Sequence, residues 1–274
     1  MGKFDGILFC TDLDGTIFKN DKTISCENIE AIEYFKKEGG YFTFITGRLP
    51  YYVSSALDKI NPNAPYGCIN GGGLYDHINK KYLWTSTMPD EVMELVKCID
   101  KNFEGVGIQI CAFEKTYFSK ENEATKRFRK ITKVENNVCH YIDVKDPIAK
   151  VMFCSTDNEE ILKIKATLEN HPLACKFDFI RSERTLFEVL PKGISKGTAI
   201  TKLCEKLNID VNKTIAIGDY NNDISMFEAA KIGIAVSNAC PEALAAADYV
   251  TVSNEESAIA QVIYDLEQGK YIQR

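Results

Sequence analysis

The feature that most constrains the fold is a short apolar run that leads into a pair of carboxylates. Residues 7–10 are all apolar, and such a run is typical of a buried central strand in an α/β protein. The residues Asp12-Leu13-Asp14-Gly15-Thr16 follow at once, and Gly15 suits a turn. Because residues i and i+2 of a strand share a face, Asp12 and Asp14 should point the same way. Ligands bind at the carboxyl ends of strands in open α/β sheets, so this junction is a candidate site.

Two adjacent carboxylates repel each other unless a cation or a shared proton relieves the repulsion. The pair therefore indicates metal binding and acid–base chemistry, although an Asp-Gly turn at a solvated strand end would also explain it. A calcium loop of the EF-hand kind is excluded, because Ile17 stands where the obligatory glycine should be and no helix precedes the loop. A dinucleotide-binding turn is also excluded, because no G-x-G-x-x-G motif follows the strand.

Strand-like and helix-like segments alternate at both ends of the chain. Ser25 provides an N-cap for an amphipathic helix that runs to Glu38. The patterns further predict a strand over 41–45, a helix ending at 60, a short strand over 67–69, a helix over 195–207, a strand over 214–217, a helix ending at 231 and a strand over 232–236. This βαβ series predicts an α/β fold with a doubly wound, mainly parallel, Rossmann-like sheet.

The rhythm changes in the middle of the chain. Strands are predicted near 106–112, 149–155, 176–181 and 186–190, and helices near 89–101, 121–131 and 158–169. This segment is predicted to be an α+β domain inserted into the first fold. The expected domains are therefore a core of residues 1–81 and 190–274, and an insertion of residues 82–189.

Composition narrows the classes of function. The 274 residues carry a formal net charge of -6, which argues against a general binder of nucleic acid or of anionic membranes. No apolar run is long enough to span a membrane, and no signal-peptide pattern is present. The ten cysteines contain no C-x-x-C pair, so reduced thiols in the cytoplasm are expected. The three histidines show no metal-ligand spacing.

Another acidic cluster follows the strand predicted over 214–217. Gly218-Asp219 and Asn222-Asp223 stand at the start of the next helix, where such residues also serve as helix caps. Together with Asp12 and Asp14 they make an oxygen-only set of the kind that Mg²⁺ prefers.

Two further positions are suited to an anion. Thr46 stands at a strand end before Gly47, where its hydroxyl and nearby backbone N–H groups could donate, although plain turn chemistry also explains it. Lys196 opens the helix predicted over 195–207, where its charge has the wrong sign for the helix dipole. It therefore needs either solvent or an anion.

These segments together resemble the haloacid dehalogenase superfamily of phosphotransferases. The four motifs correspond to residues 12–16, residues 46–48, Lys196 and residues 218–223, in the order that the superfamily requires. The Cof-type subfamily is suggested by Asn70-Gly71, residues 193–197 and residues 222–226. Two departures from its pattern are the glycine-rich run that continues through residues 72–73 and the absence of glycine at 256–258.

The resemblance implies a role for each motif residue. Asp12 would attack phosphorus to form an aspartyl-phosphate, while Asp14 would protonate the leaving alcohol and then accept a proton from water, for which its neighbours would have to hold a proton at neutral pH. The implied magnesium ligands are Asp12, the backbone carbonyl of Asp14 and Asp219, with Asp223 acting through water. Residues implied to bind phosphate are Thr46, Gly47, Lys196 and Asn222, and those implied to contact the rest of the substrate are Arg48, Asn70 and Gly71.

The resemblance thus predicts a magnesium-dependent phosphatase that hydrolyses small phosphorylated metabolites, in particular sugar phosphates, with the inserted segment as a cap that selects substrates. Two alternatives stay open: a phosphomutase of the same superfamily, and a non-catalytic regulator that binds phosphometabolites. The expected partner is a small phosphorylated metabolite, without nucleic acid or membrane, and the expected state is a monomer or a homodimer.

Overall fold

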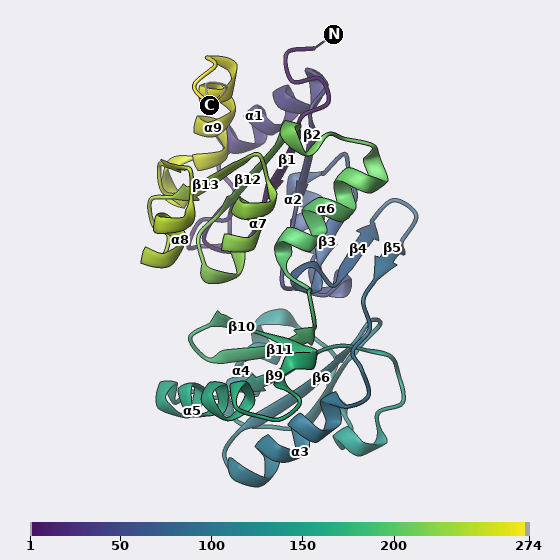
Figure 1. Ribbon diagram of the computed structural model, residues 1–274. Coiled ribbons are helices and arrows are strands. Elements are labelled where there is room, and N and C mark those ends of the chain that lie inside the picture. Colours follow the sequence, from purple (N-terminus) through teal and green to yellow (C-terminus); the bar gives the residue numbers. More distant parts are fainter. Residues whose placement is uncertain (1, 272–274) are drawn as a thin grey trace. The chain divides into compact units, whose positions relative to one another are not determined.

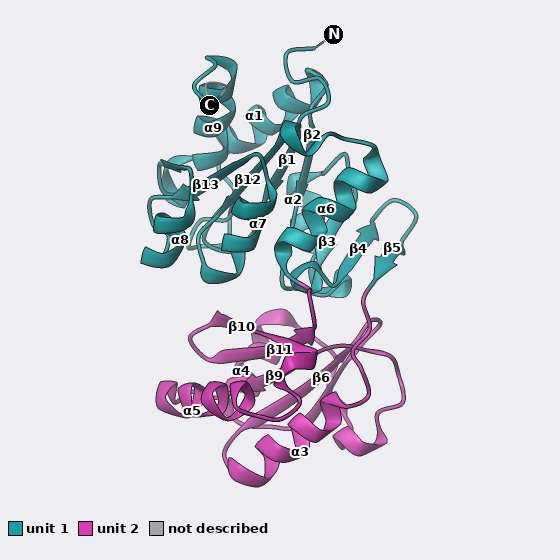
Figure 2. Cartoon of the chain, viewed as in Figure 1, with its two compact units in different colours: residues 1–85, 195–274 teal, residues 86–194 magenta. Residues whose placement is uncertain are grey.

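The computed structural model describes residues 2–271 and divides into two compact units. Unit 1 consists of residues 1–85 and 195–274, and unit 2 of residues 86–194 (Figure 2). Unit 2 is therefore a continuous segment inserted into unit 1, and each unit is described by itself below.

A parallel five-stranded sheet forms the centre of unit 1 (Figure 1). Its order is β14-β13-β12-β1-β2, with β1 (Leu8–Thr11), β2 (Tyr41–Phe44), β12 (Thr214–Gly218), β13 (Ile232–Val236) and β14 (Tyr249–Thr251). Strand β1 pairs with β12 on one side and β2 on the other, so that Leu8 lies opposite both Thr214 and Tyr41. The strands are almost entirely buried, as a sheet covered on both faces requires, except for the edge strand β14, where Val250 is exposed. The predicted α/β fold class is confirmed.

The chain changes direction across this sheet at β1. Helix α1 (Cys26–Lys37) leads from β1 outward to β2, whereas α7 (Ile224–Ala229) leads from β12 outward to β13. Right-handed crossovers in opposite directions place their helices on opposite faces. Accordingly α1 packs with α9 (Ala258–Glu267), and α7 packs with α6 (Lys196–Leu207) and α8 (Pro241–Ala246). The gap between the carboxyl ends of β1 and β12 is thus the topological switch point, where ligands bind in such sheets.

Local signals explain where several elements begin. The Ser25 hydroxyl accepts a hydrogen bond from the backbone N–H of Asn28, so Ser25 is the N-cap of α1 as predicted. The helix predicted to end at residue 60 is a short 3-10 turn over Pro50–Tyr52 followed by α2 (Ser54–Ile60). Helices α8 and α9 and strand β14 were not predicted.

A small antiparallel sheet of β3 (Tyr66–Cys68), β4 (Gly73–Asp76) and β5 (Lys81–Thr85) completes unit 1. Because β5 pairs with β4, residues 82–85 belong to unit 1 and not to the insertion as predicted. At the other end, β11 (Leu186–Pro191) pairs with β10 (Phe177–Glu183) as far as Pro191. The predicted boundaries at 82 and 189 therefore both fall inside strands, and the observed boundaries follow the strand pairing.

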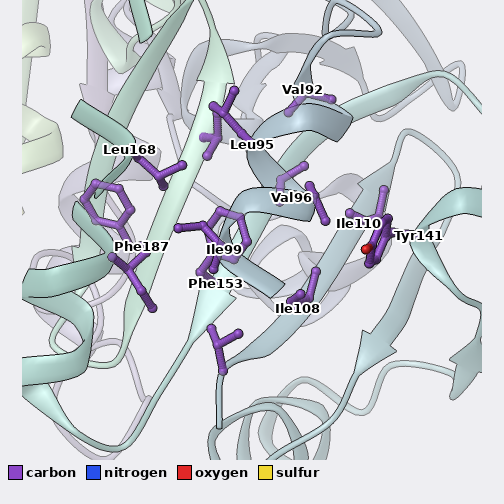
Figure 3. Close-up of a cluster of buried hydrophobic side chains, with 14 of the residues drawn as sticks. Val92, Leu95, Val96, Ile99, Ile108, Ile110, Tyr141, Phe153, Leu168 and Phe187 are labelled. Atoms are coloured by element: carbon purple, nitrogen blue, oxygen red, sulfur yellow. The ribbon is translucent and has the colours of Figure 1, made fainter. Parts of the chain in front are cut away.

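Unit 2 has α+β architecture. Its mainly antiparallel sheet has the order β10-β11-β9-β6-β7-β8, with β6 (Gly107–Ala112), β7 (Thr116–Lys120), β8 (Asn137–Val138) and β9 (Ile148–Cys154). Helices α3 (Val92–Asn102) and α5 (Asn158–Glu169) pack on one face, where they bury a cluster that includes Leu95, Leu168 and Phe153 (Figure 3). Helix α4 (Glu123–Thr132) contacts β6. Strands β7 and β8 were not predicted.

Two further observations concern the whole described chain. Within residues 2–271 no helix is both long and apolar enough to cross a membrane. All ten cysteines lie in this range, and each is a free thiol.

Candidate active site

Three carboxylates converge at the switch point of the parallel sheet. Asp12 directly follows β1, Asp219 directly follows β12, and Asp223 ends the 3-10 turn Asn221–Asp223. One oxygen of each carboxylate lies within 4.8 Å of those of the other two. The backbone N–H of Asp12 donates to the carbonyl of Ile217 at 2.9 Å, so the two strand ends are still paired at this point. Residues that are far apart in the sequence therefore meet here, as the strand-end argument predicted.

Lys196 supplies a buried cation between two of these carboxylates. It is the first residue of α6, and its Nζ lies 2.6 Å from Oδ1 of Asp12 and 2.6 Å from Oδ1 of Asp223. Lys196 is only 1% exposed, so these contacts are sheltered from water. This explains how a lysine is tolerated at a helix N-terminus, where its charge opposes the helix dipole.

Burial sets the protonation of the acidic cluster. It raises the pKa of Asp12, although the nearby Lys196 works against the rise. Burial and the neighbouring charge of Asp223 raise the pKa of Asp219 to about 6. Burial would lower the pKa of Lys196, but the two carboxylates raise it above its ordinary value, so the lysine stays charged. Three carboxylates and one lysine leave a net negative charge at the site, which a cation would relieve.

The turn after Asp14 is shaped to receive Asp219. Gly15 has φ +84, and a Cβ atom there would lie 2.5 Å from Oδ2 of Asp219, so only glycine fits. The Thr16 hydroxyl donates to Oδ1 of Asp219 at 2.9 Å. The side-chain amide of Asn238 donates to the Gly15 carbonyl at 2.9 Å. Neither Thr16 nor Asn238 was among the predicted site residues.

Asp223 is fixed by the backbone that precedes it. Its Oδ2 accepts hydrogen bonds from the backbone N–H groups of Asp219 at 2.9 Å and Tyr220 at 3.0 Å. This is the capping geometry that was the alternative interpretation of the acidic cluster. Because Oδ1 of the same carboxylate meets Lys196, Asp223 both caps the turn and takes part in the charged cluster.

The Asp14 carboxylate lies outside this cluster and is held by two cations. Arg48 Nη2 lies 2.6 Å from its Oδ2, and Lys22 Nζ lies 2.9 Å from its Oδ1. Burial works to raise the pKa of Asp14, but the charges of Arg48 and Lys22 lower it. These neighbours therefore favour the ionised form, and the role of Asp14 as a proton donor stays a prediction. Only the backbone carbonyl of Asp14 remains as its expected contribution to a metal site.

Lys22 was missed because it belongs to none of the motifs. It lies in the turn after Phe18, with a left-handed φ of 64°, and its carbonyl accepts a hydrogen bond from Lys59 Nζ at 2.9 Å. The one local signal is Asp21, whose carboxylate accepts hydrogen bonds from both the backbone and the hydroxyl of Thr23. That signal predicts a turn but does not predict where the Lys22 side chain points.

The remaining predicted residues surround the end of β2. Thr46 is nearly buried, its backbone N–H donates to the Gly67 carbonyl at 3.0 Å, and its hydroxyl accepts from the backbone N–H of Arg48 at 3.2 Å. The Asn222 side-chain amide, which is partly exposed, donates to Oδ1 of Asn70 at 3.1 Å. The structure thus links the Thr46 segment and the Asn222 segment through the loop that carries Asn70.

Asn70 and Gly71, which were predicted to contact the substrate, are both buried. Asn70 is fully buried, at 0% exposure. Gly71 has φ +94 and packs against the backbone of Ser195, so closely that a Cβ atom would lie 1.8 Å from the Ser195 carbonyl oxygen. Neither residue presents an exposed surface in this structure, and their contact with the substrate stays a prediction.

The fold and these residues define a hydrolase site of a known kind. The model of the haloacid dehalogenase-like hydrolase family matches residues 9–263, and the chain belongs to that family. The match covers both parts of unit 1 and the whole of unit 2.

Curated relatives agree with this assignment and are named phosphatases. A 5-amino-6-(5-phospho-D-ribitylamino)uracil phosphatase of Bacillus subtilis is 29% identical, over 95% of this chain and 98% of its own length. A putative phosphatase of the same organism is 30% identical, over 96% and 99%. A pyridoxal phosphate phosphatase of Escherichia coli is 26% identical, over 92% and 96%. The expectation that this chain is a phosphatase-type hydrolase is confirmed at this level.

Solved structures show the same fold. A haloacid dehalogenase-like hydrolase from Bacteroides thetaiotaomicron superposes with a TM-score of 0.82 at 25% identity, covering 95% of this chain and 99% of the other. A sugar phosphatase of haloacid dehalogenase subclass IIB superposes with a TM-score of 0.83 at 23% identity, covering 95% and 98%. The second likeness is evidence for the fold alone.

Proposed function

We propose that this protein is a magnesium-dependent phosphatase that hydrolyses small phosphorylated metabolites, sugar phosphates among them, through an aspartyl-phosphate on Asp12. The observation that carries the proposal is the cluster of Asp12, Asp219 and Asp223 around the buried Lys196 at the switch point of the sheet. Carboxylates held this close repel one another and destabilise the fold unless a cation is bound, and clusters of this kind mark functional sites.

The donor set fits magnesium. Mg²⁺ is bound through a few carboxylate oxygens together with water and substrate phosphate, and the three carboxylates offer oxygen only. Asp12 and Asp219, with the backbone carbonyl of Asp14, would hold the ion, and Asp223 would support it. When bound, the cation would offset the repulsion between nucleophile and phosphate and stabilise the charge of the transition state.

The residues of the chain would share the remaining work in two steps. Lys196 holds Oδ1 of Asp12 and so fixes the carboxylate for attack on phosphorus. An Asp12–phosphorus bond forms while the bond from phosphorus to the alcohol oxygen breaks, and Asp14 gives its proton to that oxygen. Water then attacks phosphorus, passes a proton to Asp14 and releases Asp12. The ion pairs of Asp14 favour its ionised form, which the second step needs. In the first step Asp14 must carry a proton, so the substrate must loosen these ion pairs before that step.

Phosphate recognition would fall to donors around the cluster. Lys196 contacts the cluster directly, and it would hold the phosphoryl oxygens together with Asn222, Thr46 and the backbone of Gly47. Arg48 would contact the substrate beside Asp14. The substrate-selecting role of unit 2 is proposed from its place of insertion alone. The ten free thiols support a cytoplasmic setting, in which we propose a monomer or a homodimer.

The deciding experiment is a panel of phosphorylated sugars, polyols, nucleotides and cofactors, assayed for phosphate release with Mg²⁺ and with EDTA. We expect release from at least one sugar phosphate, lost with EDTA, and an acid-stable but hydroxylamine-sensitive phosphoprotein during turnover. Conversion of one sugar phosphate into its isomer without net release would indicate the phosphomutase instead. Binding of the esters without any turnover would indicate the regulator.

A further inference from the structure

Three consecutive residues beside the candidate site adopt left-handed backbone conformations. Ile69 has φ 58, Asn70 has φ 51 and Gly71 has φ +94. Positive φ is easy for glycine and tolerated by asparagine, but for a β-branched residue such as Ile69 it is a genuine outlier. Conformations of this kind cost about 1–3 kcal/mol each and persist only where their surroundings fix them, typically at functional sites.

Backbone hydrogen bonds join this turn to the segment after β2. The N–H of Ile69 donates to the carbonyl of Arg48 at 3.0 Å, and the N–H of Asn70 donates to the carbonyl of Thr46 at 3.0 Å. The strained turn is therefore bound to the residues proposed to recognise phosphate.

The Asn70 side chain makes the second connection. Its Oδ1 accepts the hydrogen bond from Asn222 Nδ2 at 3.1 Å. It also packs against Gly47, where a Cβ atom would lie 3.0 Å from the same oxygen. Asn70 is fully buried, so solvent does not compete for these contacts of its side chain.

The hydrogen bond with Asn70 determines the orientation of the Asn222 side-chain amide. An asparagine amide has a donor end and an acceptor end that are nearly equal in shape, and its nitrogen carries two hydrogens. The Asn70 oxygen selects the nitrogen end of Asn222 and uses one of those hydrogens. The other hydrogen stays on the same end and is available to a phosphoryl oxygen. Without this contact the amide could turn over and present its oxygen to the anion.

We infer that Asn70 is a positioning residue, which fixes the Asn222 amide and the Thr46–Gly47 segment in one arrangement for phosphate without touching phosphate itself. The inference rests on the proposed function, because it assumes that Asn222 and Thr46 bind the phosphoryl group. It gives Asn70 a role besides the predicted substrate contact.

The test is the variant Asn70→Gly, which keeps the left-handed backbone and deletes the amide. We expect the Kd for inorganic phosphate with Mg²⁺, measured by calorimetry, and the KM for the best ester each to rise about tenfold, with kcat changing less. Asn70→Ser also removes the amide and serves if the glycine variant does not fold, since serine adopts a left-handed conformation in this chain at Ser257. The matched control is Asn208→Gly, which changes the exposed left-handed asparagine at the C-cap of α6 and should leave all three quantities unchanged.

A double-mutant cycle with Asn222→Ala separates positioning from a merely structural role. If Asn70 acts through Asn222, the double variant should bind phosphate no more than about threefold worse than Asn222→Ala alone. Additive losses, or wild-type phosphate binding in a folded Asn70 variant, would overturn the inference. If wild-type protein binds phosphate more tightly than Asn70→Gly yet hydrolyses no ester, the proposed function fails and the positioning role stands.

Discussion

Lys22 Nζ lies 2.9 Å from Oδ1 of Asp14, so a residue outside every motif contacts the proposed acid–base group. Its turn is braced by Lys59, whose Nζ donates to the Lys22 carbonyl. The contact is half of a clamp, since Arg48 holds the other oxygen of the same carboxylate. The clamp of Lys22 and Arg48 favours the ionised form of Asp14.

Replacing Lys22 should change the pH dependence of turnover. Lys22 lowers the pKa of Asp14, so Lys22→Met should raise that pKa. If Asp14 accepts the proton of water in the second step, the acid limb of the kcat profile should move to higher pH. Lys19→Met, in the same turn, is the control. An acid limb that does not move in Lys22→Met would show that Asp14 does not limit turnover as a base.

Asp12→Asn should abolish turnover and preserve the fold. The substitution keeps the size of the side chain but removes the nucleophilic carboxylate, so phosphate release should fall by about 10⁴-fold or more. Steady-state assays with Mg²⁺ and a thermal melt followed by circular dichroism check both parts. Metal-dependent hydrolysis that survives in a folded Asp12→Asn protein would refute the role of Asp12.

Lys196→Met should destabilise the metal-free protein. Removing a buried cation leaves Asp12 and Asp223 uncompensated, which costs about 3–5 kcal/mol of unfolding free energy. Mg²⁺ should restore more stability to this variant than to wild type, because the ion replaces the lost charge. Urea unfolding in EDTA and in Mg²⁺ measures both effects. Lys202→Met, in a more exposed ion pair on the same helix, should cost less than about 1 kcal/mol. Equal losses in the two variants would contradict the prediction.

Gly71→Ala should impair folding and activity together. The methyl group would meet the Ser195 carbonyl oxygen at 1.8 Å, next to Lys196, and the backbone would also be strained. Gly269→Ala is a matched control, because Gly269 has φ +75 but nothing within 4 Å of its added Cβ, and it should cost only about 1 kcal/mol. The difference in unfolding free energy between the two variants isolates the clash. If they were equally stable and active, the close approach would have no consequence.

Asp265 should make the protein more stable above pH 4 than below it. Burial would raise the pKa of Asp265, but hydrogen bonds from Lys270 and Tyr271 lower it below the unfolded value of about 3.9. A lowered pKa stabilises the fold above the unfolded pKa, and this stabilisation is lost as the pH falls through the folded pKa. Asp265→Asn should therefore be less stable than wild type at pH 7 in urea unfolding, with a smaller difference at pH 3. A difference that does not change with pH would contradict this.

The convergence of the acidic residues could be predicted because it follows from simple rules. Apolar strands that end in Asp12 and Asp219 have their carboxyl ends at the same edge if the sheet is parallel, and the structure shows that these two strands are also neighbours. The contact between Asn70 and Asn222 could not be predicted in this way. These residues are 152 positions apart, and both are small polar residues in turns, whose side-chain directions no periodicity specifies.

The missed elements are mostly short or irregular. Helix α8 has six residues and β14 has three, so neither is long enough to show a clear period. Helix α9 is different, because it has ten residues and follows Ser257, a residue type common at N-caps, so its pattern could have been predicted from the sequence. Strands β4 and β5 follow a glycine-rich turn and were not predicted, so residues 82–85 of β5 were assigned to the insertion.

The two strands that pair with the central strand β1 are synthesised at very different times. Its partner β2 follows within the same first stretch of chain, whereas β12 comes only after the whole of unit 2. A chain emerging from the ribosome therefore carries Asp12 on a strand with one open edge until residues 214–218 have been made. Unit 2 is complete before that edge closes, so the growing polypeptide acquires its second domain before it acquires a working active centre.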